Sequence, residues 1–147
     1  MKTNEFGRSM IEMLGVLAIV GVLSVAGISG YARAMEKYKI NKVKDEMNQI
    51  ATNIMTMFSG IGTYKNLNTE VAQSLGVIPE SMYKSGEARH AFGGTITIEE
   101  KSYGGIEGAA FSITFNGLPQ SVAIQLGTDT SYDLNRNLMY VQLGSSN

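Results

Sequence analysis

Residues 10–28 read MIEMLGVLAIVGVLSVAGI, and each of them is apolar or small apart from Glu12 and Ser24. As a helix that rises ~1.5 Å per residue, a run of about 19 such residues is long enough to cross the hydrocarbon of a bilayer. Only a short polar stretch precedes it, whereas a secretory signal peptide has a longer basic region and a cleavage point after its apolar run. Ala26-Gly27 offers such a point, so ordinary signal cleavage there remains an alternative.

The helical pattern continues beyond the apolar run, since the first proline is Pro79. Apolar residues then recur at spacings of four and three, which predicts one buried stripe on an amphipathic helix. The stripe consists of Val43, Met47, Ile50, Ile54 and Met57. We therefore expect one helix over about 9–58, ended by Gly60 and the glycine two residues later. Its weakest point is expected near 27–30, because glycine costs about 1 kcal/mol against alanine in a helix.

The remaining sequence predicts a small head that combines a helix with strands. Asn68 or Thr69 can cap a short helix that Gly76 ends. Alternating apolar residues then predict four short strands. These are 95–99, 110–115, 121–126 and 138–143. An antiparallel sheet of about four strands, packed on the amphipathic half of the long helix, buries both apolar faces. The expected fold class is therefore α+β.

Composition excludes several kinds of site. The chain has no cysteine, which removes disulfides, thiolate metal sites and cysteine nucleophiles. A formal net charge of −1 is not the basic net charge that is typical of nucleic-acid-binding domains, so no sequence-specific nucleic-acid partner is expected. His90 is the single histidine, has no clustered carboxylates beside it, and is predicted to be a surface loop residue. Because no catalytic constellation or phosphate-cradling loop can be assembled, we expect neither an enzyme nor a cofactor.

A polar stretch at 127–137 is predicted to be a long surface loop. Asp129 and Asp133 within it are weak candidates for a calcium site, because hard cations take oxygen ligands. Their spacing does not match the EF-hand loop, and the chemistry of polar turns explains them equally well.

The N-terminal residues resemble the processing site of type IV pilins, in the stretch Gly7-Arg8-Ser9-Met10-Ile11-Glu12-Met13-Leu14. The resemblance implies that a prepilin peptidase cuts after Gly7, so that 1–7 is a cleaved leader and Glu12 becomes the fifth residue of the mature chain. It further implies that 8–30 is the membrane segment and later the filament core, with a pilin head over 31–147. Entry into a sheet through a Gly-Gly pair, Gly93-Gly94, is similar to type IVb pilins.

What this resemblance implies for function is a structural subunit of a type IV, IVb-like pilus serving adhesion, aggregation, motility or DNA transfer. Its subunits would sit in the bacterial inner membrane with the leader cytoplasmic and the head periplasmic. The assembly machinery would then polymerise them, through their N-terminal helices, into an extracellular homo-oligomeric pilus. The alternatives are a pseudopilin of a type II secretion system and a non-polymerising, single-pass anchor for a binding domain.

The chain departs from the family pattern in three ways. Arg8 stands where the family usually has an apolar residue, which leaves N-methylation of that residue open. The cysteine pair that usually closes the C-terminal loop of the family is missing, and so is the proline that many relatives carry in the middle of the helix.

Glu12 is the expected assembly residue, because a carboxylate in hydrocarbon costs about 2.5–3.5 kcal/mol and normally has a partner. That partner is either the α-amino group of a neighbouring subunit or, within its own helix, Arg8. Small residues recur every three positions along the apolar run and are expected to pack helices together, although glycine and alanine are also common in membrane helices generally. They are Gly15, Ala18, Gly21, Ser24 and Gly27.

Basic residues concentrate on the far side of the apolar run. They are Arg33, Lys37, Lys39, Lys42 and Lys44, against Lys2 and Arg8 before it. The positive-inside tendency would put the head in the cytoplasm, opposite to what the resemblance implies. The cluster can pair with acidic neighbours in a filament or form a solvated helix face.

The first testable prediction is that maturation leaves a chain beginning at Arg8, because Gly7 stands five residues before Glu12. The intact mass of the membrane-extracted protein checks it directly. A mature chain beginning after Ala26 or Gly27 would instead identify the apolar run as an ordinary signal sequence.

Overall fold

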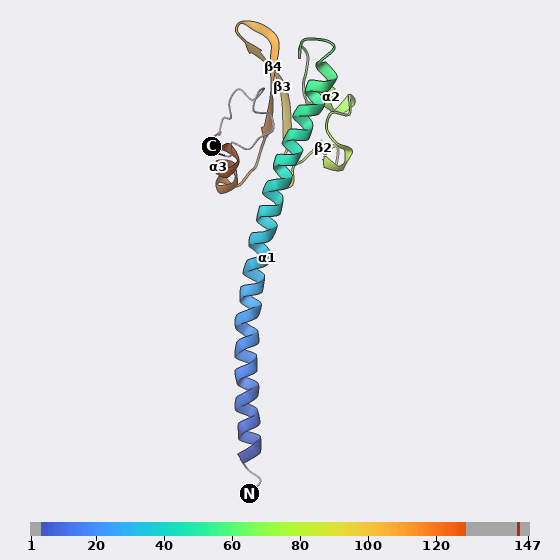
Figure 1. Cartoon of the computed structure of the whole chain (residues 1–147). Helices are drawn as coiled ribbons and strands as arrows, with labels where there is room; N and C mark the ends of the chain where they lie inside the picture. Colours follow the sequence, from blue (N-terminus) through green and yellow to red (C-terminus); the bar gives the residue numbers. More distant parts are fainter. Residues whose placement is uncertain (1–3, 129–143, 145–147) are drawn as a thin grey trace. The chain divides into compact units, whose positions relative to one another are not determined.

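The computed structural model describes residues 4–128 and residue 144. Its elements follow in the order α1 (Asn4–Phe58), α2 (Thr69–Ser74), η1 (Glu80–Met82), β1 (Tyr83–Lys84), β2 (Glu87–Ala88), β3 (Ile96–Tyr103), β4 (Ile106–Phe115) and α3 (Gln120–Thr128) (Figure 1). The chain divides into two compact units, Met1–Tyr38 and Lys39–Asn147. The first unit holds the apolar part of α1, and the second holds the rest of α1 and the head.

The predicted long helix is confirmed. α1 ends at Phe58, and the backbone N–H groups of Ile61 and Gly62 both donate to the Phe58 carbonyl at 3.0 Å. The helix passes through 27–30 without a break, so the glycines there do not interrupt it. It also begins earlier than expected, at Asn4 rather than near residue 9, so Gly7 lies within the helix.

The amphipathic half of α1 supplies the core of the head. Ile50 and Ile54 are fully buried, and they pack with residues of α2, the following loop and β3. Burying each such side chain stabilises the fold by about 1.5–3 kcal/mol. The prediction that Met57 belongs to the buried stripe is wrong. Met57 is 47% exposed, and Phe58 is buried instead. A four-residue step from Ile54 keeps Phe58 on the face that the core covers.

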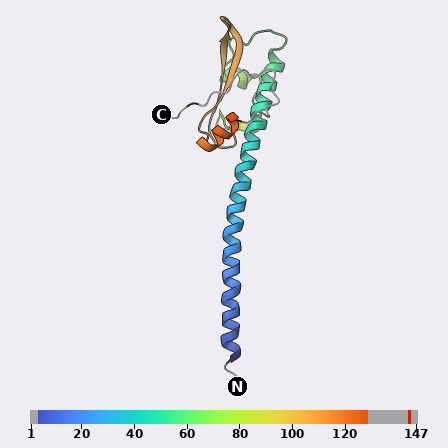
Figure 2. The ribbon, with the colours of Figure 1, turned by 60° about the vertical axis from the view of Figure 1, so that its left-hand side comes forward.

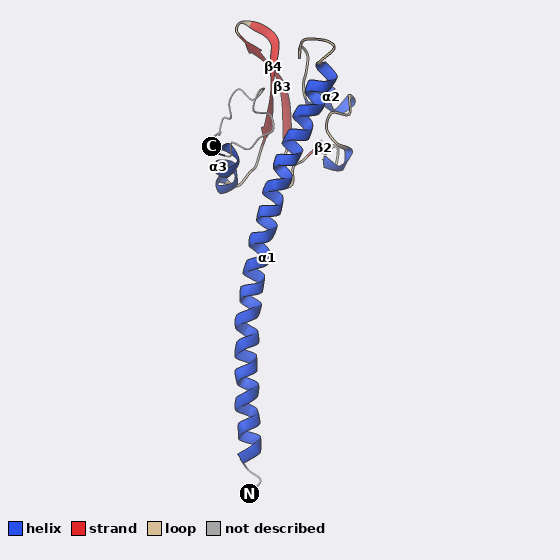
Figure 3. Ribbon diagram, in the orientation of Figure 1, coloured by secondary structure: helices blue, strands red, loops and turns tan. Residues whose placement is uncertain are grey.

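The α+β class is confirmed, although the strands form two hairpins rather than one sheet. β3 pairs antiparallel with β4, from Ile96 opposite Phe115 to Tyr103 opposite Ile106. β1 pairs separately with β2, a short hairpin that the sequence analysis did not predict. The β3–β4 hairpin runs beside the C-terminal part of α1 in both views of the ribbon, and colouring by secondary structure separates the two (Figures 2 and 3).

The strand predicted at 121–126 is wrong, because these residues lie in the helix α3. The alternation of Val122, Ile124 and Leu126 fits a strand, but a four-residue step also places Val122 and Leu126 on one face of a helix. Those two side chains are buried in a second core cluster with Ile40 and Val43 of α1, while Ile124 is 48% exposed. The strand predicted at 138–143 lies outside the described residues.

The short helix was predicted correctly. Asn68 caps α2, since its Oδ1 accepts a hydrogen bond from the backbone N–H of Val71 at 2.9 Å. Gly76 ends the helix with a positive φ of 68°, a conformation that favours glycine.

His90 corrects another prediction, because it is 4% exposed rather than a surface residue. It belongs to a turn, residues 89–94, that packs Ala91 and Phe92 against the second core cluster. The Nδ1 of His90 accepts the backbone N–H of Phe92 at 3.1 Å, so Nε2 carries the proton and donates to the Asn116 carbonyl at 2.7 Å. Both ring nitrogens are thus hydrogen-bonded. Only the neutral imidazole can make both bonds, because one nitrogen must accept while the other donates.

Glu46 of α1 also binds the 89–94 turn. It is 7% exposed, and its Oε2 accepts the backbone N–H of Ala91 at 3.1 Å. Burial raises the pKa of the Glu46 carboxyl above 4.5, an effect that the Ala91 N–H and the Lys42 charge oppose. Burial lowers the pKa of His90 below 6.5, against the effect of its hydrogen bond to Asn116.

Replacing Gly94 by Ala should destabilise the head by about 2–3 kcal/mol, because the new Cβ would overlap the Asn116 carbonyl and the His90 ring. Gly60→Ala is the matched control, since a Cβ there meets nothing within 4 Å, and its effect should stay within about 0.5 kcal/mol. Thermal unfolding of the detergent-solubilised chain, followed by the near-ultraviolet circular dichroism of its tyrosines, measures both. Equal melting temperatures for the two variants would contradict the close approach of Gly94 to Asn116.

The head should lose stability as the pH falls below 6.5, because the unfolded chain then binds a proton at His90 that the folded head resists. Glu46 acts in the opposite sense, and its raised pKa removes stability as the pH rises above 4.5. Glu46→Gln keeps an acceptor for the Ala91 N–H and removes the charge. It should therefore raise the melting temperature at pH 7.5 and steepen the fall toward pH 5. A variant that is less stable than the wild type at pH 7.5 would show that the Glu46 charge is itself stabilising.

Candidate functional site: the N-terminal helix

The predicted processing and assembly residues all lie on the first turns of α1. The Nε of Arg8 is 3.8 Å from Oε1 of Glu12, an i,i+4 ion pair whose side chains are 85% and 72% exposed. An exposed pair with the cation on the N-terminal side adds little stability. Glu12 therefore remains accessible to a stronger partner outside the chain. Gly7 is exposed one residue before this pair, and a Cβ there would meet no atom within 4 Å.

The apolar run presents its whole circumference to the surroundings. Its large side chains are between 51% (Val20) and 72% (Ile28) exposed. α1 is long and apolar enough to cross a membrane by length and composition, with a most apolar window of mean hydropathy 2.3 that is entirely unburied. The one hydroxyl in the run, on Ser24, donates to the Val20 carbonyl at 2.7 Å, so it needs no partner from outside. Such a surface requires lipid or other apolar helices to cover it.

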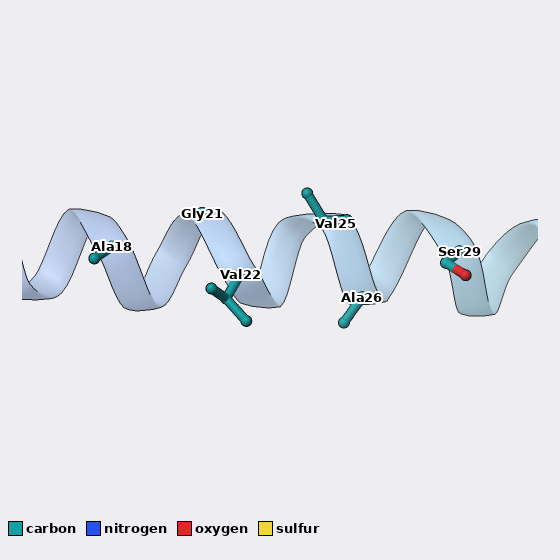
Figure 4. A pocket seen from close by; sticks show the side chains of 6 residues that line it. All are labelled: Ala18, Gly21, Val22, Val25, Ala26 and Ser29. Carbon is teal, nitrogen blue, oxygen red and sulfur yellow. The ribbon is translucent and has the colours of Figure 1, made fainter.

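The small residues divide between two faces of the helix. At ~100° per residue, Gly15, Ala18 and Gly21 span about 120° of one face, whereas the same three-residue step carries Ser24 and Gly27 round to the other side. A shallow depression runs along the first face (Figure 4). It is lined by Ala18, Gly21, Val22, Val25, Ala26 and Ser29. A Cβ added at Gly15 or Gly21 would meet nothing within 4 Å among the described residues, so no contact seen there requires their small size.

The basic cluster that follows the run is not one continuous surface. Arg33, Lys37 and Lys42 are exposed. Lys39 instead places its Nζ over the Phe92 ring, 5.8 Å from the centroid, and so belongs to the head. Two residues that the sequence analysis did not single out, Tyr31 and Tyr38, are 69% and 59% exposed beside these cations. The signal for them was present in the sequence, since tyrosines that directly follow an apolar span are typical of membrane interfaces.

No group of three or more metal-ligating side chains occurs within the described part of the chain. The calcium candidates Asp129 and Asp133 lie outside it.

Comparison with known proteins agrees with the predicted family. The chain is 27% and 26% identical, over 124 residues, to two proteins named toxin coregulated pilin, one from Vibrio cholerae and one from Vibrio cholerae serotype O1 strain El Tor Inaba N16961. Each match covers 82% of this chain but 55% of the relative, so the chain spans about half the length of the curated relatives it matches. No solved structure matches.

A model of one protein family, described as PilS N terminal, matches residues 37–142. This match lies almost wholly within the head, whereas the processing motif and the apolar run precede it, so the two indications of family are independent. The chain therefore belongs to the PilS family of type IV pilins.

Proposed function

We propose that this chain is a structural subunit of a type IV, IVb-like pilus, held in the bacterial inner membrane by α1 and then polymerised through α1 into an extracellular filament. The observation that carries the proposal is the apolar run at 10–28, whose large side chains are exposed on every face of the helix, joined to a head with its own buried core. A subunit that remained an anchored monomer would need only lipid around its apolar run. A filament subunit exchanges lipid for neighbouring helices, and the same apolar surface suits both.

Helix packing in the filament would use the face of Gly15, Ala18 and Gly21. Between helices in an apolar medium, small residues allow close backbone approach and dispersion contacts over a long interface. The shallow depression of Figure 4 overlaps this face at Ala18 and Gly21, where a larger side chain of the next subunit would pack. This packing is not directional along the axis, so it does not fix the register of one helix against the next.

Glu12 supplies the missing axial register. Cleavage after Gly7 would create an α-amino group at Arg8, four residues from Glu12. An amino group of a neighbouring subunit at ~4 Å, in surroundings of effective dielectric near 20, attracts that carboxylate by about 4 kcal/mol. The exposed ion pair to Arg8 is a weaker competitor, because water screens it.

A pseudopilin would share the anchoring and the processing, and it differs in the length of the filament that it builds. Electron microscopy of cells labelled with antibody to the head separates long surface filaments from short periplasmic ones. A chain that is processed, inserted and never polymerised would be the membrane-anchored binding domain instead.

Glu12→Gln should abolish filament assembly while leaving membrane insertion and head folding intact. Removing a carboxylate makes insertion easier by up to about 2.5–3.5 kcal/mol, so a failure to assemble reports the lost partner rather than a damaged monomer. Filament yield in sheared cell fractions measures assembly, and the membrane-bound pool of subunit measures insertion.

Arg8→Ala is the matched control, since it keeps the α-amino group and removes only the guanidinium. It should assemble nearly normally if the amino group is the partner. Normal assembly of the Glu12→Gln variant, or an equal loss in both variants, would refute the pairing between subunits.

A further inference from the structure

We propose that Tyr31, Arg33, Lys37 and Tyr38 form a belt that binds anionic phospholipid headgroups and so fixes the depth of α1 in the membrane. The inference rests on the membrane insertion that the proposed function includes, but not on filament assembly. All four residues lie within the unit Met1–Tyr38, from three to ten residues beyond Ile28, the last residue of the apolar run. Among the described residues, neither Arg33 nor Lys37 has an ion-pair partner.

The four residues of the belt lie within an arc of about 160° around the helix, with the cations at one end of the arc and the tyrosines at the other. Arg33 and Lys37 are four residues apart and about 40° apart around the axis. Tyr31 and Tyr38 are seven residues apart and share a face about 100–160° away from the two cations. A layer of headgroups around a helix that crosses it meets both the cations and the tyrosines.

The direction of the side chains supports the same occupant. In an α-helix the Cα–Cβ bonds tilt toward the N-terminus, which here is the direction of the apolar run. Long basic side chains at Arg33 and Lys37 therefore lean back toward the membrane surface and can place their charges among phosphates. Tyrosine, with an apolar ring and a polar hydroxyl, suits the same layer.

The spacing of the belt from the other end of the run matches a bilayer. Tyr31 is nineteen residues from Glu12, a rise of ~28 Å along the helix, and the hydrocarbon core is ~30 Å thick. With Tyr31 at one boundary, Glu12 and Arg8 reach the opposite headgroup layer. Between these boundaries the hydroxyl of Ser24 is satisfied by the Val20 carbonyl. The belt thus keeps the Glu12 carboxylate out of hydrocarbon until the subunit assembles.

Glu36 lies within the belt and is exposed, and it repels anionic lipid. Substitutions of neighbouring residues should therefore change the preference for anionic lipid in opposite directions. Removing a cation should weaken the preference for anionic lipid, and Glu36→Gln should strengthen it. Loss of helical packing or of insertion would not produce such opposite effects.

The test uses the full chain reconstituted in phosphatidylcholine vesicles that contain a trace of spin-labelled lipid. Electron paramagnetic resonance gives the fraction of lipid that the protein immobilises. The ratio of that association for labelled phosphatidylglycerol over labelled phosphatidylcholine is the readout. An exposed cation at the surface contributes at most about a fivefold preference. We expect a ratio of several-fold for the wild type, a clearly lower ratio for Arg33→Gln with Lys37→Gln, and a higher ratio for Glu36→Gln.

The matched control is Lys65→Gln with Lys84→Gln, which removes two exposed cations of the head and should leave the ratio unchanged. Added salt at 0.5 M should lower the wild-type ratio, because it screens the attraction.

Three results would overturn the inference. Immobilised lipid with the same ratio in the wild type and the Arg33→Gln, Lys37→Gln variant would refute the belt and leave membrane insertion standing. No immobilised lipid of either kind would refute insertion as well, and with it the membrane stage of the proposed function. A preference that disappears as the protein density rises would assign Arg33 and Lys37 to acidic residues of a second copy.

Discussion

The structure depends on one constraint, which is that the first part of α1 has an apolar surface that stays exposed among the residues of its own unit, Met1–Tyr38, that the structure describes. Its backbone is fully hydrogen-bonded within the helix, so the segment is stable in an apolar medium without any partner strand. The same surface in water is unfavourable in proportion to its area. Every other feature of this segment follows from that requirement, including the satisfied hydroxyl of Ser24 and the polar residues that bound the run at both ends.

In the head, by contrast, a small core is buried around the amphipathic half of the same helix. This core consists of two clusters. In one, Ile50 and Ile54 pack with the β3–β4 hairpin, and in the other, Ile40 and Val43 pack with α3. The 89–94 turn carries polar groups into the second cluster, and their pairing with Glu46 and with the Asn116 carbonyl makes that burial tolerable. Since the chain has no cysteine, the core and these hydrogen bonds hold the head together without a disulfide.

Local patterns predicted the parts of the fold that local physics decides. The apolar run, the end of α1 at Phe58 and the Asn68 cap of α2 each depend on residues close in sequence, and all three are confirmed. The errors have a common cause in long-range contacts. Val122 and Leu126 fit either a strand or a helix until the partner surface at Ile40 and Val43 is known. His90 was placed at the surface because nothing near it in sequence reveals the Asn116 carbonyl that accepts its proton. At the candidate site, the sequence gives the order of charge, apolar run and small residues. The helical geometry adds which of them share a face.

The second core cluster also bears on the order in which the chain folds during synthesis. Ile40 and Val43 reach their partners in α3 only after about 80 more residues have been made, which takes roughly 4–16 s at ~5–20 residues per second. Helix formation in the apolar run needs no such wait, since it takes about a microsecond. The run is therefore helical and ready for insertion well before the head can close. Translocation of the head, which the proposed function requires, would then meet an open chain rather than a folded domain.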